Sequence, residues 1–312
     1  MTRKLFPVLA AIALASAPAL HGAIRMNRAD TGPEALASGP AAGLGVNLAA
    51  IGHLPAGALV FQTEVNVQNN TSVAAQIDVY FDGVSGGAPF AVNASISSAG
   101  ALVAQGSGGT VRGHSNVHFD DFVDALVQAG LLPASVETNG ILGSALFVFN
   151  GFNKSGQGSA VARFYVEACG GTVGQAINGR EVTTAERTKL VTFVRDSRGQ
   201  PGPQLYPNLF VNNMGLTPTG SGTATAIDVQ LSAFSNATGN PVGTPTTLHG
   251  INPGATVLVG NVLATLGVPA GEDTVLVTID VVSGNAAIDG GVVELDLTTK
   301  DGTASSAANG SN

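Results

Sequence analysis

The sequence predicts an all-β chain of two tandem antiparallel β-sandwiches, each with one short crossover helix. Short segments alternate apolar and polar residues with a period of two, as expected of strands with one buried face. Gly- and Asn-rich turns separate these segments at the spacing typical of sandwiches. Three blocks of the first half also recur in the same order in the second half. The 312 residues are 44% hydrophobic, which suffices for a substantial core, and only 11% charged.

In the first half, strands are expected at 61–67 and 75–81, with a turn signal between them. Further strands are expected at 90–96, 101–105, 115–119, 144–149 and 160–167. The segment 120–130 instead predicts a short helix, because an aspartate can cap its start and Phe122 and Leu126 share one helical face.

The second half repeats this layout. Three blocks recur: 75–79 at 224–229, 122–134 at 261–270, and 144–149 at 274–279. Three matches in one order indicate a tandem duplication of a single sandwich, with longer loops in the first copy.

The domain boundaries follow from composition. Residues 20–45 are rich in Ala, Gly and Pro and predict a flexible leader. The first sandwich is expected at 46–175 and the second at 201–301, joined by a connector at 176–200. Residues 302–312 are small and polar, and a disordered tail is expected there.

The N-terminus has the pattern of a secretory signal peptide, predicted at residues 1–19. Arg3 and Lys4 precede an apolar stretch, and small residues follow up to Ala19. Cleavage is expected after Ala19, with Ala23 as a weaker alternative, because signal peptidase accepts small side chains. The stretch is shorter than the roughly 18 apolar residues of a membrane anchor. The sequence therefore predicts a secreted protein, extracellular or at the cell surface, with no membrane span.

Charge and cysteine content narrow the function classes. After removal of the signal the chain carries ten more acidic than basic residues, so a nucleic-acid partner is not expected. Cys169 is the only cysteine, so no intramolecular disulfide can form, which suits bacterial export. Five basic residues lie close together and indicate either a positive patch or, as we favour, solvated charges on the connector: Arg180, Arg187, Lys189, Arg195 and Arg198.

Four short segments carry a family resemblance: Gly52-His-Leu-Pro-Ala-Gly-Ala-Leu-Val-Phe-Gln-Thr-Glu-Val-Asn-Val-Gln-Asn-Asn-Thr71, Ala162-Arg-Phe-Tyr165, Gly170-Gly-Thr-Val-Gly-Gln175 and Leu209-Phe-Val-Asn-Asn213. With them the chain resembles secreted bacterial proteins of tandem immunoglobulin-like β-sandwich repeats, a largely uncharacterised group. The resemblance covers roughly residues 46–299 and departs at Gln62, where the family has a basic residue. It implies two immunoglobulin-like sandwiches and no particular activity.

The candidate metal ligands are His118 and Asp120. On a strand His114, Asn116, His118 and Asp120 would share one face, while the residues between them point inward. Ligands two positions apart lie about 7 Å from each other and can hold one ion, whereas His114 and His118 would be about 13 Å apart. His118 and Asp120 thus form a possible site for calcium or another divalent ion. The alternative is a solvated polar face leading into the helix cap.

Other chemical motifs are explained by turns. Aspartates beside glycines, such as Asp82 and Asp289, invite a calcium interpretation, but no twelve-residue calcium loop is present and turn formation explains them. Gly83-Val-Ser85-Gly-Gly87 matches the hydrolase nucleophile elbow, yet the residues that follow cannot start the required helix. No catalytic residue and no cofactor are predicted.

These observations predict a secreted, non-enzymatic structural or binding protein of the bacterial cell surface or extracellular matrix. Its expected partners are an extracellular protein or polysaccharide, or a second copy of the chain, reached through exposed edge strands. One alternative is a carbohydrate-binding module that stacks sugars on Tyr80, Tyr165 or Tyr206, although the chain has no Trp. A further alternative is a metal-dependent hydrolase that uses His118 and Asp120.

Overall fold

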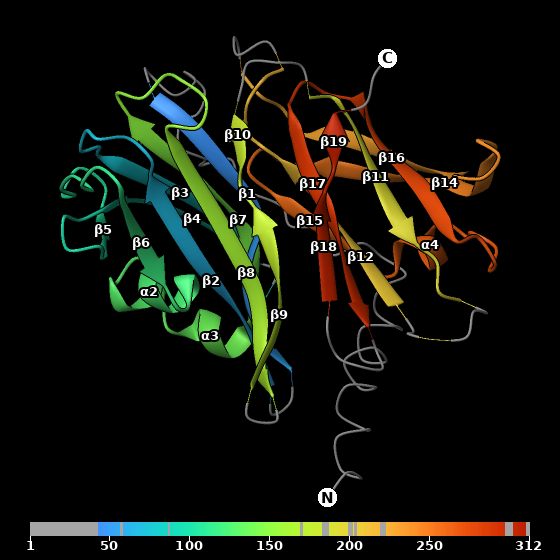
Figure 1. The fold of residues 1–312 in the computed structure, drawn as a ribbon, viewed down its shortest axis with the longest axis horizontal. Coiled ribbons are helices and arrows are strands. Elements are labelled where there is room, and N and C mark those ends of the chain that lie inside the picture. Colours follow the sequence, from blue (N-terminus) through green and yellow to red (C-terminus); the bar gives the residue numbers. More distant parts are fainter. Residues whose placement is uncertain are drawn as a thin grey trace, which may run out of the picture.

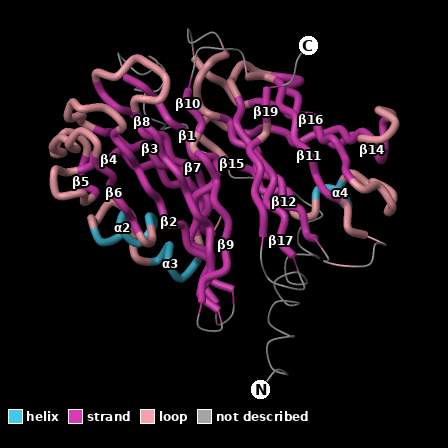
Figure 2. The backbone as a smooth tube through the Cα atoms, in the orientation of Figure 1, coloured by secondary structure: helices cyan, strands magenta, loops and turns pink. Residues whose placement is uncertain are grey.

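The structure is a computed structural model, and it describes residues 43–56, 59–86, 88–168, 171–182, 187–198, 202, 205–218, 223–296 and 302–309. The described chain is all-β, with antiparallel sheets and three short helices (Figures 1 and 2). The predicted signal peptide, most of the predicted leader and Cys169 lie outside the described residues.

The first half contains β1 to β10 with α2 and α3. Their bounds are β1 Gly43–Ala56, β2 Leu59–Asn69, β3 Ile77–Ser85, β4 Ala88–Ile96, β5 Leu102–Ala104, β6 Ser115–Phe119, α2 Phe122–Gln128, α3 Ser135–Asn139, β7 Ile141–Asn150, β8 Gly158–Ala168, β9 Gly171–Asn178 and β10 Arg180–Val182. One layer, the β3 sheet, has the order β5-β4-β3-β7-β1, with β10 also paired to β1. The other layer, the β2 sheet, has β6, β2, β8 and β9 in that order. β1 joins the two layers, because its end pairs with β2.

The second half contains β11 to β19 with α4. Their bounds are β11 Lys189–Arg195, β12 Leu205–Asn213, β13 Ile227–Ser235, β14 Pro241–Ile251, β15 Thr256–Val259, α4 Val262–Thr265, β16 Thr274–Ser283, β17 Ile288–Asp296, β18 Gly302–Ser306 and β19 Ala308–Asn309. The β13 sheet has the order β14-β13-β16-β11-β19, and the β12 sheet has the order β15-β12-β17-β18. Apart from β5, each strand of the first half has a counterpart here in the same order within its sheet, but the pairing of β1 with β2 has no counterpart among the described pairings.

The strands and the helix predicted in the first half are present. β6 has the predicted bounds, and its Val117 and Phe119 are buried while His118 is exposed. Asp121 caps α2, because its side chain accepts hydrogen bonds from two backbone N–H groups of the first turn. Phe122 of this helix is fully buried and contacts three other phenylalanine rings, so the helix closes one end of the first core.

Three predicted boundaries differ from the structure. Residues 176–200, expected as a connector, contain the end of β9, all of β10 and all of β11. Within the expected tail 302–312, residues 302–306 form β18 and 308–309 form β19. Residues 43–45, assigned to the leader, already belong to β1. In each case backbone pairing supplies the order that composition does not reveal: β1 pairs with β7 and β10, β11 pairs with β16, and β18 pairs with the strand before it, β17.

The two halves share apolar packing. Ala50 and Leu142 of the first half are buried within the hydrophobic cluster of the second half. The edge strands β9 and β18 also lie side by side (Figure 1), and Gln175 of β9 donates a hydrogen bond to the backbone oxygen of Glu294 in β17. Within the described residues, no helix has both the length and the apolar character needed to cross a membrane.

Candidate binding surface

His118 and Asp120, the predicted metal ligands, contact each other. The Nε2 atom of His118 lies 2.8 Å from Oδ1 of Asp120, and its Nδ1 atom lies 3.0 Å from Oδ1 of Asn66. Both ring nitrogens are therefore engaged, and a metal ion would have to displace one of these contacts. His114 lies in the turn before β6 with a left-handed backbone (φ 51°), so it does not continue the strand face. Among the described residues, no group of three or more His, Cys, Asp or Glu side chains could hold a metal ion.

The pair belongs to a larger group of charged and polar side chains on the outer face of the β2 sheet. The carboxylate of Glu64 lies 3.7 Å from Nδ1 of His118 on one side and 3.7 Å from Nη1 of Arg163 on the other. The Arg163 guanidinium lies over the ring of Tyr165, 5.4 Å from its centroid. We call this group the β2-sheet face, and it consists of Glu64, Asn66, His118, Asp120 and Arg163. Asp120 and His118 are its most exposed members, with 93% and 41% of their side chains accessible.

Of the three tyrosines proposed as sugar platforms, Tyr165 is buried, and Tyr80 and Tyr206 are partly exposed. Tyr165 is buried, its hydroxyl donates to the backbone oxygen of Asp120, and Arg163 covers its ring. Tyr80 is half-buried, and its hydroxyl accepts a hydrogen bond from Gln105. Burial raises the pKa of Tyr80, and the negative charge of Asp78 raises it further.

A buried histidine–aspartate pair lies below the β2-sheet face. Nδ1 of His53 is 2.7 Å from Oδ2 of Asp121, the residue that caps α2. Partial burial, together with a hydrogen bond and like charge from Asp124, raises the pKa of Glu137 in α3 nearby. Sequence reasoning missed this pair because the two residues are 68 positions apart and no local pattern connects them. Its visible role is to fix α2 against β1.

Buried polar side chains connect the two halves. Asn47 of β1 donates to Oδ1 of Asn212 and to Oδ2 of Asp289, both in the second half. Arg180 of β10 forms an ion pair with Asp289 at 2.9 Å. Asp289, for which the sequence favours a turn over a calcium site, lies within β17 and is already paired with a cation, and Asp82 likewise lies within β3. We call Asn47, Arg180, Asn212 and Asp289 the junction network.

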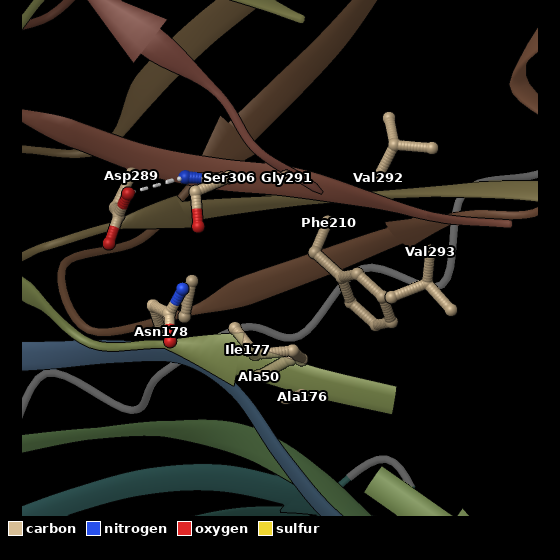
Figure 3. A pocket seen from close by; sticks show the side chains of 12 residues that line it. Ala50, Ala176, Ile177, Asn178, Phe210, Asp289, Gly291, Val292, Val293 and Ser306 are labelled. Carbon is tan, nitrogen blue, oxygen red and sulfur yellow. Dashed lines mark hydrogen bonds between the residues drawn. The ribbon is translucent and has the colours of Figure 1, made fainter. Parts of the chain in front are cut away.

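A small cavity of about 40 Å³ lies beside the junction network, between β9 and β17 (Figure 3). Asn178, Asp289 and Ser306 supply its polar lining, and Ile177 and Phe210 face it from opposite halves. Ligand sites for small molecules usually measure about 300–1,000 Å³. This cavity has room for a few water molecules and is too small for a sugar ring.

The five clustered basic residues do not form an unpaired positive patch, and among them only Arg195 and Lys189 keep more than a third of the side chain exposed. Four of them are paired with carboxylates: Arg180 with Asp289, Lys189 with Asp280, Arg195 with Glu294 and Arg198 with Asp196. The fifth, Arg187, is buried. Ser85, the serine of the elbow-like motif, is buried at the end of β3 and leads into the β3–β4 hairpin, not into a helix.

Comparison with known proteins gives no assignment. No family model matches the chain, and no curated protein matches it. Among solved structures, a lectin from Pleurotus ostreatus in complex with GalNAc is 12% identical, with 80% of this chain and 79% of that chain covered and a TM-score of 0.16. The apo form of Pleurotus ostreatus lectin is 10% identical, with 80% and 76% covered and a TM-score of 0.14. Scores this low support neither a shared fold nor a shared function.

Proposed function

We propose that the chain is a secreted, non-enzymatic protein of two tandem immunoglobulin-like sandwiches, and that it acts as a structural or binding component at the bacterial cell surface or in the extracellular matrix. The matching strand orders of the two halves support the duplication. Binding is assigned to the β2-sheet face, where charges of both signs lie on an open sheet. An open face of this kind suits an extended polysaccharide or a protein surface better than a small substrate, which needs a concave pocket.

We assign partner binding to a sheet face and not to an exposed edge strand. β14 is an eleven-residue edge strand, but it contains Pro241 and Pro245, which have no N–H group to offer a partner strand. Gly243 adds a left-handed residue (φ 71°), and the pairing of β13 with β14 is interrupted by register shifts. These features oppose strand addition at this edge.

The test is a retention experiment with the mature protein, residues 20–312, and envelope and matrix fractions of the producing cell. The variant Glu64→Gln/Arg163→Gln removes one charge of each sign from the β2-sheet face. The control Lys189→Gln/Asp280→Asn removes an exposed ion pair of the same kind from the β13 sheet. We expect the first variant to lose at least tenfold in retention and the control to match the wild type. Equal retention by both variants would contradict the assignment of the surface.

Two further arms distinguish the alternatives. Digestion of the fractions with protease or with polysaccharide-degrading enzymes identifies the class of partner, and loss of retention only in the second case would establish the carbohydrate-binding alternative. Retention abolished by a chelator and restored by a divalent ion would instead favour a metal at His118 and Asp120. Insensitivity to the chelator would remove the metal from the proposal.

A further inference from the structure

Among the described residues, no carboxylate is hydrogen-bonded to the buried Arg187 side chain. The residue is 8% exposed, and its Nη2 atom donates to the backbone oxygen of Glu181 at 2.7 Å. Its Nε and Nη1 atoms are buried and have no hydrogen-bond partner within the described part of the chain. Buried charged donors are normally paired, because an unpaired one loses its hydration without compensation.

Among the described residues, the two carboxylates that act on Arg187 accept hydrogen bonds from other groups. Oδ1 of Asp289 accepts from Nε of Arg180 and from the backbone N–H of Gly290, and Oδ2 accepts from Asn47. Oε1 of Glu181 accepts from the backbone N–H of Gly156 at 2.6 Å. Neither carboxylate accepts from Nε or Nη1 of Arg187.

The electrostatics agree with this description. Burial lowers the pKa of Arg187, and the neighbouring Arg180 lowers it further, while Asp289 and Glu181 act in the opposite direction. A bound anion would oppose both of the lowering effects.

We propose that Arg187 is the core of a binding site for one small monovalent anion, a chloride ion or a single carboxylate group. The Nε–H group and one N–H of Nη2 lie on one edge of a guanidinium. A small anion on this edge accepts from the unpartnered Nε, while the other N–H of Nη2 keeps its bond to Glu181. The ligand has to be small, because the side chain is more than nine-tenths buried.

The site lies where the two halves meet. The backbone oxygen of Arg187 accepts from Ile288 of β17 in the second half, while its Nη2 atom donates to Glu181 of β10 in the first half. An anion bound here accepts a hydrogen bond from a buried donor of Arg187 that otherwise has no partner among the described residues. Anion binding therefore strengthens the attachment of one half to the other and raises the stability of the whole protein.

Thermal unfolding of the mature protein tests the proposal. At constant ionic strength, chloride or acetate replaces the anion of a bulky sulfonate buffer that cannot enter the site. The midpoint of the wild type is expected to rise saturably by several degrees. The rise is expected to disappear in Arg187→Met and to persist in Lys154→Met, which removes an exposed cation elsewhere. Equal anion dependence in the wild type and in Arg187→Met overturns the proposal.

Crystals of the wild type grown in bromide give a second measurement that does not depend on whether a variant folds. An anomalous peak within hydrogen-bond distance of the Arg187 guanidinium supports the site. A water molecule alone in place of the anion on Nε overturns it. A carboxylate of the chain itself at this position also overturns it.

Discussion

Asn69 and Asn213 occupy corresponding positions at the ends of β2 and β12 and make corresponding hydrogen bonds. Both are fully buried. Oδ1 of each accepts from the backbone N–H two residues ahead, that of Thr71 or Gly215, at 3.0 Å. Nδ2 of each donates to two backbone oxygens, those of Val73 and Val111 for Asn69 and those of Thr225 and Ile251 for Asn213. Each asparagine thus fixes the chain that leaves the second strand of its half.

The first prediction concerns this asparagine. Asn213→Ala leaves two backbone oxygens and one N–H group without their partner, and each unsatisfied buried group costs about 1–3 kcal/mol. We expect the free energy of unfolding to fall by at least about 2 kcal/mol in denaturant titrations, and Asn69→Ala to behave in the same way. Asn70→Ala is the control, since Asn70 is exposed and its loss is expected to cost less than about 0.5 kcal/mol. A change in Asn213→Ala no larger than in the control would contradict this role.

How far the sequence predicts the fold depends on whether a segment has one buried face or two. β3 and β6 alternate clearly because one side meets the core and the other meets solvent, so period two finds them. β1 is buried on both sides around Leu48 and Ile51 and passes between two sheets, so no period of two marks it. β18 is small and polar throughout, and its pairing with β17 is not visible in its own residues.

The sequence predicts a candidate site only where its residues lie close together along the chain. His118 and Asp120 were predicted because they are two positions apart and a strand places them on one face. Arg180 and Asp289 are more than a hundred positions apart, and only the packing of one half on the other brings them together. The charge cluster of residues 180–198 therefore favours a solvated connector in the sequence, whereas Arg180, Lys189 and Arg195 pair with carboxylates about a hundred positions away.

The second prediction concerns the junction network. Asp289→Ala removes the carboxylate that pairs with Arg180 and leaves that mostly buried guanidinium uncompensated. Breaking a buried pair in this way costs about 3–5 kcal/mol, and we expect a loss near the lower end. Asp280→Ala breaks the exposed pair with Lys189 and is expected to cost at most about 1 kcal/mol. Similar losses in the two variants, measured by denaturant titration, would show that the junction contributes little to stability.

The third prediction concerns the ionisation of Tyr80. Its pKa is raised by burial and by Asp78 and lowered by the hydrogen bond from Gln105. Asp78→Asn is therefore expected to lower this pKa, and Gln105→Ala is expected to raise it further. The chemical shift of the tyrosine Cζ carbon, followed by NMR through alkaline pH, reports each tyrosine separately. Shifts of the same sign in the two variants would contradict the assigned causes.

The raised pKa of Tyr80 makes the stability of the folded state depend on pH in the alkaline range. Because the folded-state pKa of Tyr80 lies above the unfolded value near 10, the folded state holds the phenolic proton more tightly. Its contribution to stability is fully present below the unfolded pKa and is lost as the pH rises toward the folded pKa. Tyr80→Phe is therefore expected to lose less stability than the wild type above pH 10, and a parallel decline in both proteins would count against it.

The last prediction concerns an apolar row on the outer face of the β13 sheet. Phe193 of β11 lies opposite Leu276 of β16, which in turn lies opposite Phe234 of β13, so the three side chains share one face. Phe193 is 57% exposed, while Leu276 and Phe234 are partly exposed. A second copy of the chain is one of the partners that the sequence predicts, and this row is the apolar surface that such a copy would bury. Phe193→Ser is then expected to weaken self-association at least about tenfold, since burying a Phe side chain contributes about 1.5–3 kcal/mol. Val73→Ser, at an exposed apolar residue of the first half, is expected to leave the association unchanged. Sedimentation velocity over a range of concentrations measures both, and a wild type that stays monomeric throughout would exclude this row as a self-association surface.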